Sequence, residues 1–238
     1  MDFSIKKPSH IFALLVFLFA FFLIIISPIL SYFGVFPSTE TIELTGSLIL
    51  LNSIIVVLIF LGVPFIWYLL VNKCSIREML HRLKLQGEGI DTAFLWGVVI
   101  TIGMLILVMV IGVLLYQLGV NEEDISNIED IAGNLSIAAM AFVIVVQSIS
   151  EEIFFRGFLL EKIDSFAGGS MAIFGTAILF GLAHMSYGKI YPVVMPIIMG
   201  IFLGFVVFKT KNLYSAITAH VLFNFTSFIL YIFSQSLS

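Results

Sequence analysis

Long apolar runs are the feature that most limits what this chain can fold into. A helix that crosses the hydrocarbon core of a membrane needs about 20 largely apolar residues. Seven stretches reach or approach this length, and the fifth and sixth are the shortest: 10–33, 45–71, 91–118, 136–160, 170–187, 191–208 and 213–235. The sequence therefore predicts an all-α, polytopic membrane bundle of about seven transmembrane helices.

Composition supports this fold class. Only 11% of the 238 residues are charged and 61% are hydrophobic, whereas a soluble domain carries about 25% charged residues. The chain cannot cover a water-facing surface, so its expected surroundings are the lipid bilayer. The sequence has no basic patch that could bind nucleic acid, so nucleic acid is not expected as a partner. No linker divides the chain, so we expect one integrated domain with N-terminal helices in 1–135 and a second part in 136–238.

The basic residues predict an orientation in the membrane. The first apolar run follows Lys6 and Lys7 and is longer than the core of a signal peptide, so we expect it to be a retained helix. With seven spans, almost all lysines and arginines fall on one side, and only Lys189 and an acidic stretch, 121–130, fall on the other. The positive-inside rule then places the N-terminus in the cytoplasm and the C-terminus outside the cell membrane. Residues 74–86 suit either an interfacial helix or a solvated loop.

Ionisable residues gather in the late helices. Each such residue within a membrane helix costs about 2.5–3.5 kcal/mol on insertion scales, and such residues are often functional. Glu151, Glu152 and Arg156 lie in the fourth segment, His184 ends the fifth, and His220 lies in the seventh. These residues are the candidates for a functional site.

Helical spacing separates the two glutamates. Glu152 and Arg156 are four residues apart and share a helix face, so they can pair. The alternative interpretation of this pair is a purely structural, buried salt bridge. Glu151 points about 100° away from Glu152 and can face a cavity. His220 and Asn224 are also four residues apart and lie on one face of the last helix.

The depth of these groups can be compared along the chain. A turn is expected near Ala167-Gly168-Gly169, because glycine favours helix ends. Glu151 and His184 lie almost equally far from Gly168 in sequence, so two antiparallel arms would bring them to nearly one level. The fourth, fifth and seventh helices could then converge on one polar pocket, which we expect to open to the cytoplasm.

Such a pocket has a plausible chemistry. Glu151 with His184 can activate a water as general base, and His220 with Asn224 can donate hydrogen bonds to the oxyanion of a tetrahedral intermediate. This assignment requires peptide hydrolysis without a covalent intermediate. The sequence has no His-Glu-x-x-His motif of zinc peptidases, no Gly-x-Ser-Gly and no paired membrane aspartates. The single cysteine, Cys74, is expected to be structural.

Three short motifs carry a resemblance to a known family. They are Glu-Glu-x-x-x-Arg at 151–156, Phe-x-x-x-His at 180–184 and His-x-x-x-Asn at 220–224. Together they resemble the motifs of the CPBP family, which groups type II CAAX prenyl endopeptidases with bacteriocin-processing and immunity-type membrane proteins. The resemblance covers about residues 136–228, whereas the first three helices match only as generic spans.

The resemblance implies a glutamate-dependent intramembrane endopeptidase acting on prenylated C-terminal tails or hydrophobic peptides. It makes residues 136–238 the catalytic part of the chain. It also implies roles for the motif residues: Glu151 as base, His184 as its partner, His220 and Asn224 as oxyanion donors, and Glu152 and Arg156 as groups that shape the site. Phe180 is expected to pack beside His184 and hold its ring.

Several alternatives remain open at this stage. A divalent metal such as zinc could bind a carboxylate–histidine set formed by Glu151, Glu152, His184 and His220, although oxyanion donation by His220 and Asn224 favours a metal-free site. The chain could be a non-catalytic scaffold or a bacteriocin-immunity-type protein. A proton-coupled transporter is disfavoured because no internal repeat is visible.

Overall fold

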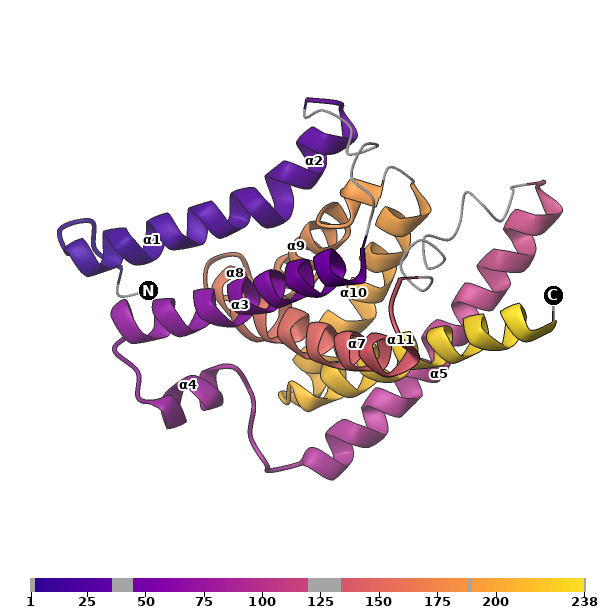
Figure 1. Cartoon of the computed structure of the whole chain (residues 1–238). Coiled ribbons are helices and arrows are strands. Elements are labelled where there is room, and N and C mark those ends of the chain that lie inside the picture. The colour runs from indigo at the N-terminus through magenta and orange to yellow at the C-terminus, as the bar shows by residue number, and fades with distance from the viewer. Residues whose placement is uncertain (1–2, 36–44, 120–133, 188–189, 238) are drawn as a thin grey trace.

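The computed structural model describes residues 3–35, 45–119, 134–187 and 190–237, and Figure 1 shows their arrangement. All regular elements in these ranges are helical, and the predicted all-α class is confirmed. The α-helices are α1 (Pro8–Phe21), α2 (Ser27–Tyr32), α3 (Gly46–Leu70), α4 (Ile76–Arg82), α5 (Ile90–Gln117), α7 (Ile137–Glu152), α8 (Leu160–Ala167), α9 (Gly169–Leu182), α10 (Tyr191–Thr210) and α11 (Tyr214–Leu237). The π-helices are η1 (Phe22–Ile26) and η3 (Ile153–Leu159), and η4 (Met185–Tyr187) is a 3₁₀ turn.

Six helical spans in the described residues are long and apolar enough to cross a membrane: Pro8–Tyr32, Gly46–Leu70, Ile90–Gln117, Ile137–Ala167, Tyr191–Thr210 and Tyr214–Ser234. The chain is therefore a multi-pass integral membrane protein. The fifth predicted segment corresponds to α9, which has 14 residues and ends at Leu182 rather than at 187. It ends early because the N–H of His184 donates to the carbonyl of Gly181, which tightens the chain into a 3₁₀ turn.

Two clusters of buried side chains hold the bundle together. The first joins α1 and α3 to the α7–η3 region through aromatic residues such as Trp67, Phe154 and Phe158. The second joins α5, α10 and α11 through residues such as Met104 and Leu203. Large apolar side chains cover the outer faces, as expected for helices in contact with lipid.

Gly97 is required where α5 packs against α11. A Cβ atom at this position would lie 2.6 Å from Cβ of Thr218 and 2.9 Å from the carbonyl oxygen of Ser215. Small residues allow membrane helices to approach this closely. We expect Gly97→Ala to destabilise the protein by about 1–3 kcal/mol through overpacking, measured as a lower melting temperature in detergent.

Gly103 provides the matched control on the same helix. A Cβ atom there meets nothing within 4 Å, so Gly103→Ala should melt at or above the temperature of the unaltered protein. Equal melting temperatures for the two variants would contradict the packing role of Gly97.

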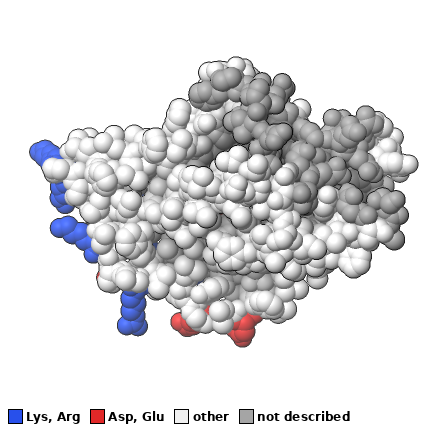
Figure 2. All heavy atoms as spheres, in the orientation of Figure 1, with Lys and Arg blue, Asp and Glu red and all other residues white. Residues whose placement is uncertain are grey.

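One end of the bundle gathers the basic connections. Asn212, in the turn between α10 and α11, donates to the carbonyls of Gln86 and Glu88, which precede α5. Arg82 of α4 pairs with Glu161 of α8 at 3.4 Å. We call this the basic end, and the opposite end, where α3, α7 and α10 begin, the far end. Figure 2 shows lysine and arginine side chains standing at the left and lower left, near the start of α1 and near α4.

The segment 74–86 contains a short helix rather than only a loop. Ser75 caps α4 by accepting from the N–H of Glu78, and the Glu78 carboxylate accepts from the N–H of Ser75 in return. These hydrogen bonds hold the pKa of Glu78 below its usual value. Lys189 and residues 121–130, which the orientation prediction also used, lie outside the described residues.

Candidate active site

The glutamate pair lies where the fourth span changes its helical winding. Glu151 and Glu152 are the last residues of α7, and the wider π turns of η3 follow directly. Single π turns within α-helices occur frequently at functional sites. Glu152 and Arg156 are fully buried, and Glu151 is 7% exposed. Two carboxylates and a guanidinium are thus held within the membrane-spanning part of the chain.

Glu152 is the centre of a buried ionic network. Its Oε1 accepts from Nη1 of Arg156 at 2.9 Å, as the four-residue spacing predicts. The same Oε1 lies 2.8 Å from Nδ1 of His220 on α11. The guanidinium carbon of Arg156 lies 4.3 Å from the centre of the Phe180 ring, which adds a cation–π contact. The network ties together η3, α9 and α11.

Glu151 has different partners, as the helical spacing predicts. Its Oε1 accepts from Nε2 of Gln147 at 3.1 Å, and its Oε2 lies 3.8 Å from Nε2 of His220. His220 therefore lies between the two glutamates. If its Nδ1–H donates to Glu152, its Nε2 carries a proton toward Glu151 only as the imidazolium. The ring can thus hold a proton next to Glu151.

Two further polar groups are oriented by neighbours. Nδ1 of His184 lies 2.7 Å from the carbonyl oxygen of Phe180. That carbonyl can only accept, so Nδ1 carries the proton and Nε2 of the neutral ring has a lone pair. The amide of Asn224 donates to Oγ of Ser148 at 3.1 Å. An amide nitrogen has two protons, so Asn224 retains a second N–H that can donate to a ligand.

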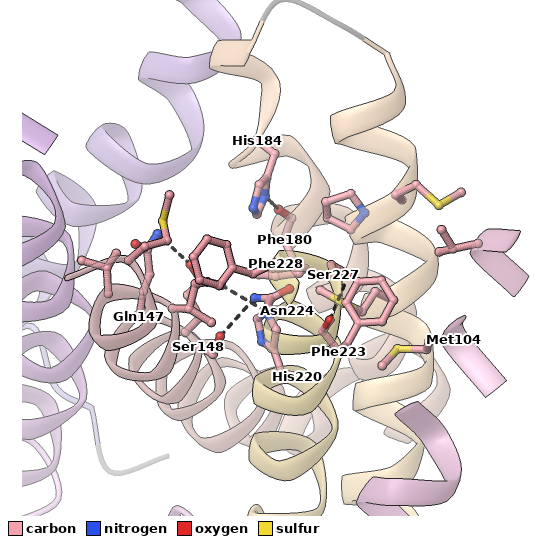
Figure 3. A pocket seen from close by; sticks show the side chains of 18 of the residues that line it. Met104, Gln147, Ser148, Phe180, His184, His220, Phe223, Asn224, Ser227 and Phe228 are labelled. Atoms are coloured by element: carbon pink, nitrogen blue, oxygen red, sulfur yellow. Dashed lines mark hydrogen bonds and ion pairs between the residues drawn. The ribbon is translucent and has the colours of Figure 1, made fainter. Parts of the chain in front are cut away.

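These side chains meet at one cavity of about 420 Å³, which is not closed off from the outside of the bundle. Figure 3 shows His220 and Asn224 projecting from α11 toward Gln147 and Ser148, with His184 and Phe180 on the neighbouring helix. The lining combines polar groups with apolar ones, which include Leu107, Val143, Met199 and Phe228. Of the sequence-predicted site residues, the structure places Glu151, Phe180, His184, His220 and Asn224 at the cavity and Glu152 with Arg156 behind it.

The cavity does not lie where the sequence analysis expected it. We expected a pocket open toward the basic, cytoplasmic end. The lining instead comes from the far-end portions of α3, α7 and α10, with residues such as Asn52, Met140 and Met195. The lining thus lies toward the far end of the bundle, whereas the opening to the cytoplasm stays a prediction. Comparing the depths of residues along the chain does not reveal which half of the bundle is packed solid.

The alternative metal set can be compared with the structure. Among the described residues, no three His, Cys, Asp or Glu side chains are grouped so that they could hold a metal ion. Glu151, Glu152, His184 and His220 all belong to these residues. They therefore do not form a metal-binding group in this arrangement, in which His220 bridges the two carboxylates.

Gln147 and Ser148 complete the site, and the sequence analysis did not assign them a function. A signal for Gln147 was available, because it precedes Glu151 by four residues and so shares its helix face. Ser148 bonds Asn224 across 76 positions of sequence, a contact that no local periodicity could reveal.

A comparison with protein families finds a match over the part of the chain that carries this site. Residues 133–226 match the family model described as type II CAAX prenyl endopeptidase Rce1-like. This range contains all three motifs and agrees with the suspected CPBP resemblance. No curated protein and no solved structure matches the chain. Over residues 133–226, the chain is therefore similar to the Rce1-like family of type II CAAX prenyl endopeptidases.

Proposed function

We propose that the protein hydrolyses peptide bonds of membrane-associated substrates with a water activated by Glu151. The observation that carries this proposal is the meeting of Glu151, His184, His220 and Asn224 at one cavity, although they come from three separate parts of the chain. We assign the catalytic core to residues 136–238, and α3 and α5 complete the cavity wall.

The proposed reaction needs only a water and these side chains. The Glu151 carboxylate takes a proton from the water, whose oxygen attacks the carbonyl carbon of the scissile bond. The carbonyl oxygen becomes an oxyanion, to which Asn224 and the imidazolium form of His220 can donate. The intermediate then collapses, the C–N bond breaks, and the proton passes to the leaving nitrogen. The products are a carboxylate and an amine, with no covalent enzyme intermediate.

The remaining residues position this machinery. Nε2 of His184 can accept a hydrogen bond from the same water and orient it, while Glu151 takes the proton. Glu152 and Arg156 fix His220 from behind, since Nδ1 of His220 bonds Glu152. Apolar lining residues suit a hydrophobic peptide or a lipid-modified tail as substrate.

A peptidase assay in detergent tests the proposal. The purified protein is incubated with a panel of prenylated and unprenylated peptides, with and without a chelator and added zinc. Cleavage that His184→Ala abolishes and that the chelator leaves unchanged supports a metal-free peptidase. Loss in chelator with recovery on adding zinc would instead require a metal. Failure of the folded protein to cleave any peptide would favour a scaffold or immunity role, and proton-coupled flux in proteoliposomes would favour a transporter.

Gln147 should act as a positioning residue for the base. Its amide donates to Oε1 of Glu151, and a hydrogen bond to a charged group contributes about 1.5–3 kcal/mol. We expect Gln147→Ala to lower kcat by about 10- to 100-fold while KM changes little, because the substrate still binds. Steady-state kinetics of peptide cleavage measure both constants.

Ser150 offers the control for this variant. Its hydroxyl donates to the backbone carbonyl of Gln147 but does not line the cavity. Ser150→Ala should keep kcat close to that of the unaltered protein. A loss for Gln147→Ala that appears in KM alone would show that Gln147 binds substrate and does not position Glu151.

A further inference from the structure

We propose that Asn52 of α3 binds the main chain of the substrate, by donating to and accepting from one peptide unit a short distance from the scissile bond. The inference rests on the proposed peptidase function and adds a property of the substrate: the segment that occupies the cavity is extended, so that its peptide units are free to bond the protein. The argument combines the chemistry of Asn52 with its position along the cavity.

Asn52 is one of two polar side chains in a long apolar part of α3. Between Leu48 and Ile66, every residue other than Asn52 and Ser53 is apolar, glycine or proline. A polar group in a membrane-spanning helix is costly unless it is hydrogen-bonded. The hydroxyl of Ser53 donates to the carbonyl of Ile49 at 2.9 Å. Within the described ranges the Asn52 amide has no such partner, and Asn52 is an exposed residue on the cavity wall.

The cavity extends along α7 from the level of Asn52 to Glu151. Its lining residues on α7 follow one face from Met140 to Glu151 at spacings of three or four, which corresponds to about 16 Å of helix. The starts of α3 and α7 are adjacent, because a Cβ atom on Gly46 would clash with the carbonyl oxygen of Asn134. Asn52 follows Gly46 by six residues, as Met140 follows Asn134. This contact therefore places Asn52 near Met140, at the end of the wall remote from Glu151.

A second contact places Asn52 nearer to the glutamate. The ring centres of Phe60 on α3 and Phe154 on η3 are 5.2 Å apart. Asn52 precedes Phe60 by eight residues and Glu151 precedes Phe154 by three, so the two differ by about 8 Å along the bundle. The two contacts together give a separation of about 8 to 16 Å. Because an extended chain covers about 3.3 Å per residue, the peptide unit at Asn52 is about two to five residues from the scissile bond.

The Asn52 amide is chemically matched to a peptide unit. Its NH₂ group donates and its oxygen accepts, so it can pair with the carbonyl and the N–H of a main chain whatever the side chains are. The cavity wall has two other amides among the described residues: Gln147 bonds Glu151, and Asn224 bonds Ser148. Asn52 keeps both groups for a ligand. A helical substrate could not use them, because its peptide units are paired within the helix.

Replacement of Asn52 by leucine tests the contact. Asn52→Leu keeps the approximate size of the side chain and suits an apolar helix, so its melting temperature in detergent should equal or exceed that of the unaltered protein. We expect KM for peptide cleavage to rise by about 5- to 50-fold, the effect of one or two neutral hydrogen bonds. The value of kcat should change little, because the contact is the same in the bound substrate and in the transition state.

Leu51→Ala is the matched control on the same turn of α3. Leu51 is 53% exposed and does not line the cavity, so KM and kcat should stay close to those of the unaltered protein. An unchanged KM for Asn52→Leu would overturn the inference. A loss in kcat alone would overturn it too, because that result is expected of a residue that acts on the reacting groups.

Peptides with one main-chain N–H replaced by an ester oxygen locate the bound unit. In the unaltered protein, an ester about two to five residues from the scissile bond should raise KM, because Asn52 loses the N–H that its oxygen accepts. In Asn52→Leu the same ester should have no further effect, since the two changes remove one contact. Esters that affect both proteins equally at every position would contradict main-chain binding by Asn52.

A binding assay separates this inference from the proposed function. Fluorescently labelled peptide is titrated with Glu151→Gln and with Glu151→Gln/Asn52→Leu in detergent, and anisotropy gives Kd. We expect the second protein to bind about 5- to 50-fold more weakly. If the unaltered protein cleaves no peptide, the peptidase proposal fails, while weaker binding without Asn52 still supports the contact. Cleavage with equal Kd values for the two proteins would overturn the contact and leave the peptidase proposal intact.

Discussion

Glu151→Gln should lower kcat/KM for peptide cleavage by about 10²- to 10⁴-fold, the contribution of a general base. Glutamine keeps the size of the side chain and can still bond Gln147, which lies 3.1 Å from Oε1 of Glu151. It cannot take a proton from water at neutral pH. The expected loss is therefore in the chemical step, and purified protein in detergent with a fluorogenic peptide measures it.

Two measurements guard this result against a folding artefact. Glu151→Gln should melt within a few degrees of the unaltered protein, because no ion pair shorter than 3.8 Å is lost. Glu88→Gln, at an exposed position before α5 where only the backbone carbonyl is used, should retain activity. Cleavage by Glu151→Gln at a rate close to that of the unaltered protein would exclude Glu151 as the base.

Arg156→Ala should destabilise the protein more than any other single change considered above, by about 3–5 kcal/mol. The substitution leaves Glu152 buried without its cation, removes the cation–π contact with Phe180, and opens a cavity among aromatic rings. The free energy of unfolding in detergent, or the melting temperature where unfolding is irreversible, measures the loss. Activity should fall too, because Glu152 no longer holds His220 in place.

A double variant separates the charge from the packing. In Glu152→Gln/Arg156→Met no ionised partner is left buried alone, and methionine refills much of the volume. We expect this protein to be more stable than Arg156→Ala, while cleavage stays impaired because His220 has lost its carboxylate partner. Equal destabilisation by the double variant and by Arg156→Ala would show that shape, rather than the buried charge, dominates at this position.

Local patterns in the sequence were sufficient for most of the architecture. Apolar runs located the helices, including the short α9, and glycine located the turn at Gly168, which adopts a φ of 84°. The spacing of four residues predicted the Glu152–Arg156 pair, which is present at 2.9 Å. These features depend on residues close in sequence, where helical geometry is nearly fixed.

Contacts between distant residues were beyond such patterns. His220 bonds Glu152 across 68 positions of sequence. The π turns of η3 also change the directions in which the side chains after Glu152 point, and a 3.6-residue period does not describe this change. The position of the cavity toward the far end depends on which half of the bundle the phenylalanines of η3 and α9 fill. That outcome is set by the volumes of side chains from several helices together.

The wall of the cavity is formed by residues inside and outside the family match. Asn52 and Ser53 of α3, and Met104 and Leu107 of α5, line the cavity but lie outside the family match at residues 133–226. On the proposed mechanism, the hydrolytic groups lie within the matched region, whereas part of the surface that touches the substrate lies on helices outside it. Substrate preference can then diverge by change in the early helices while the chemistry of the late helices stays constant.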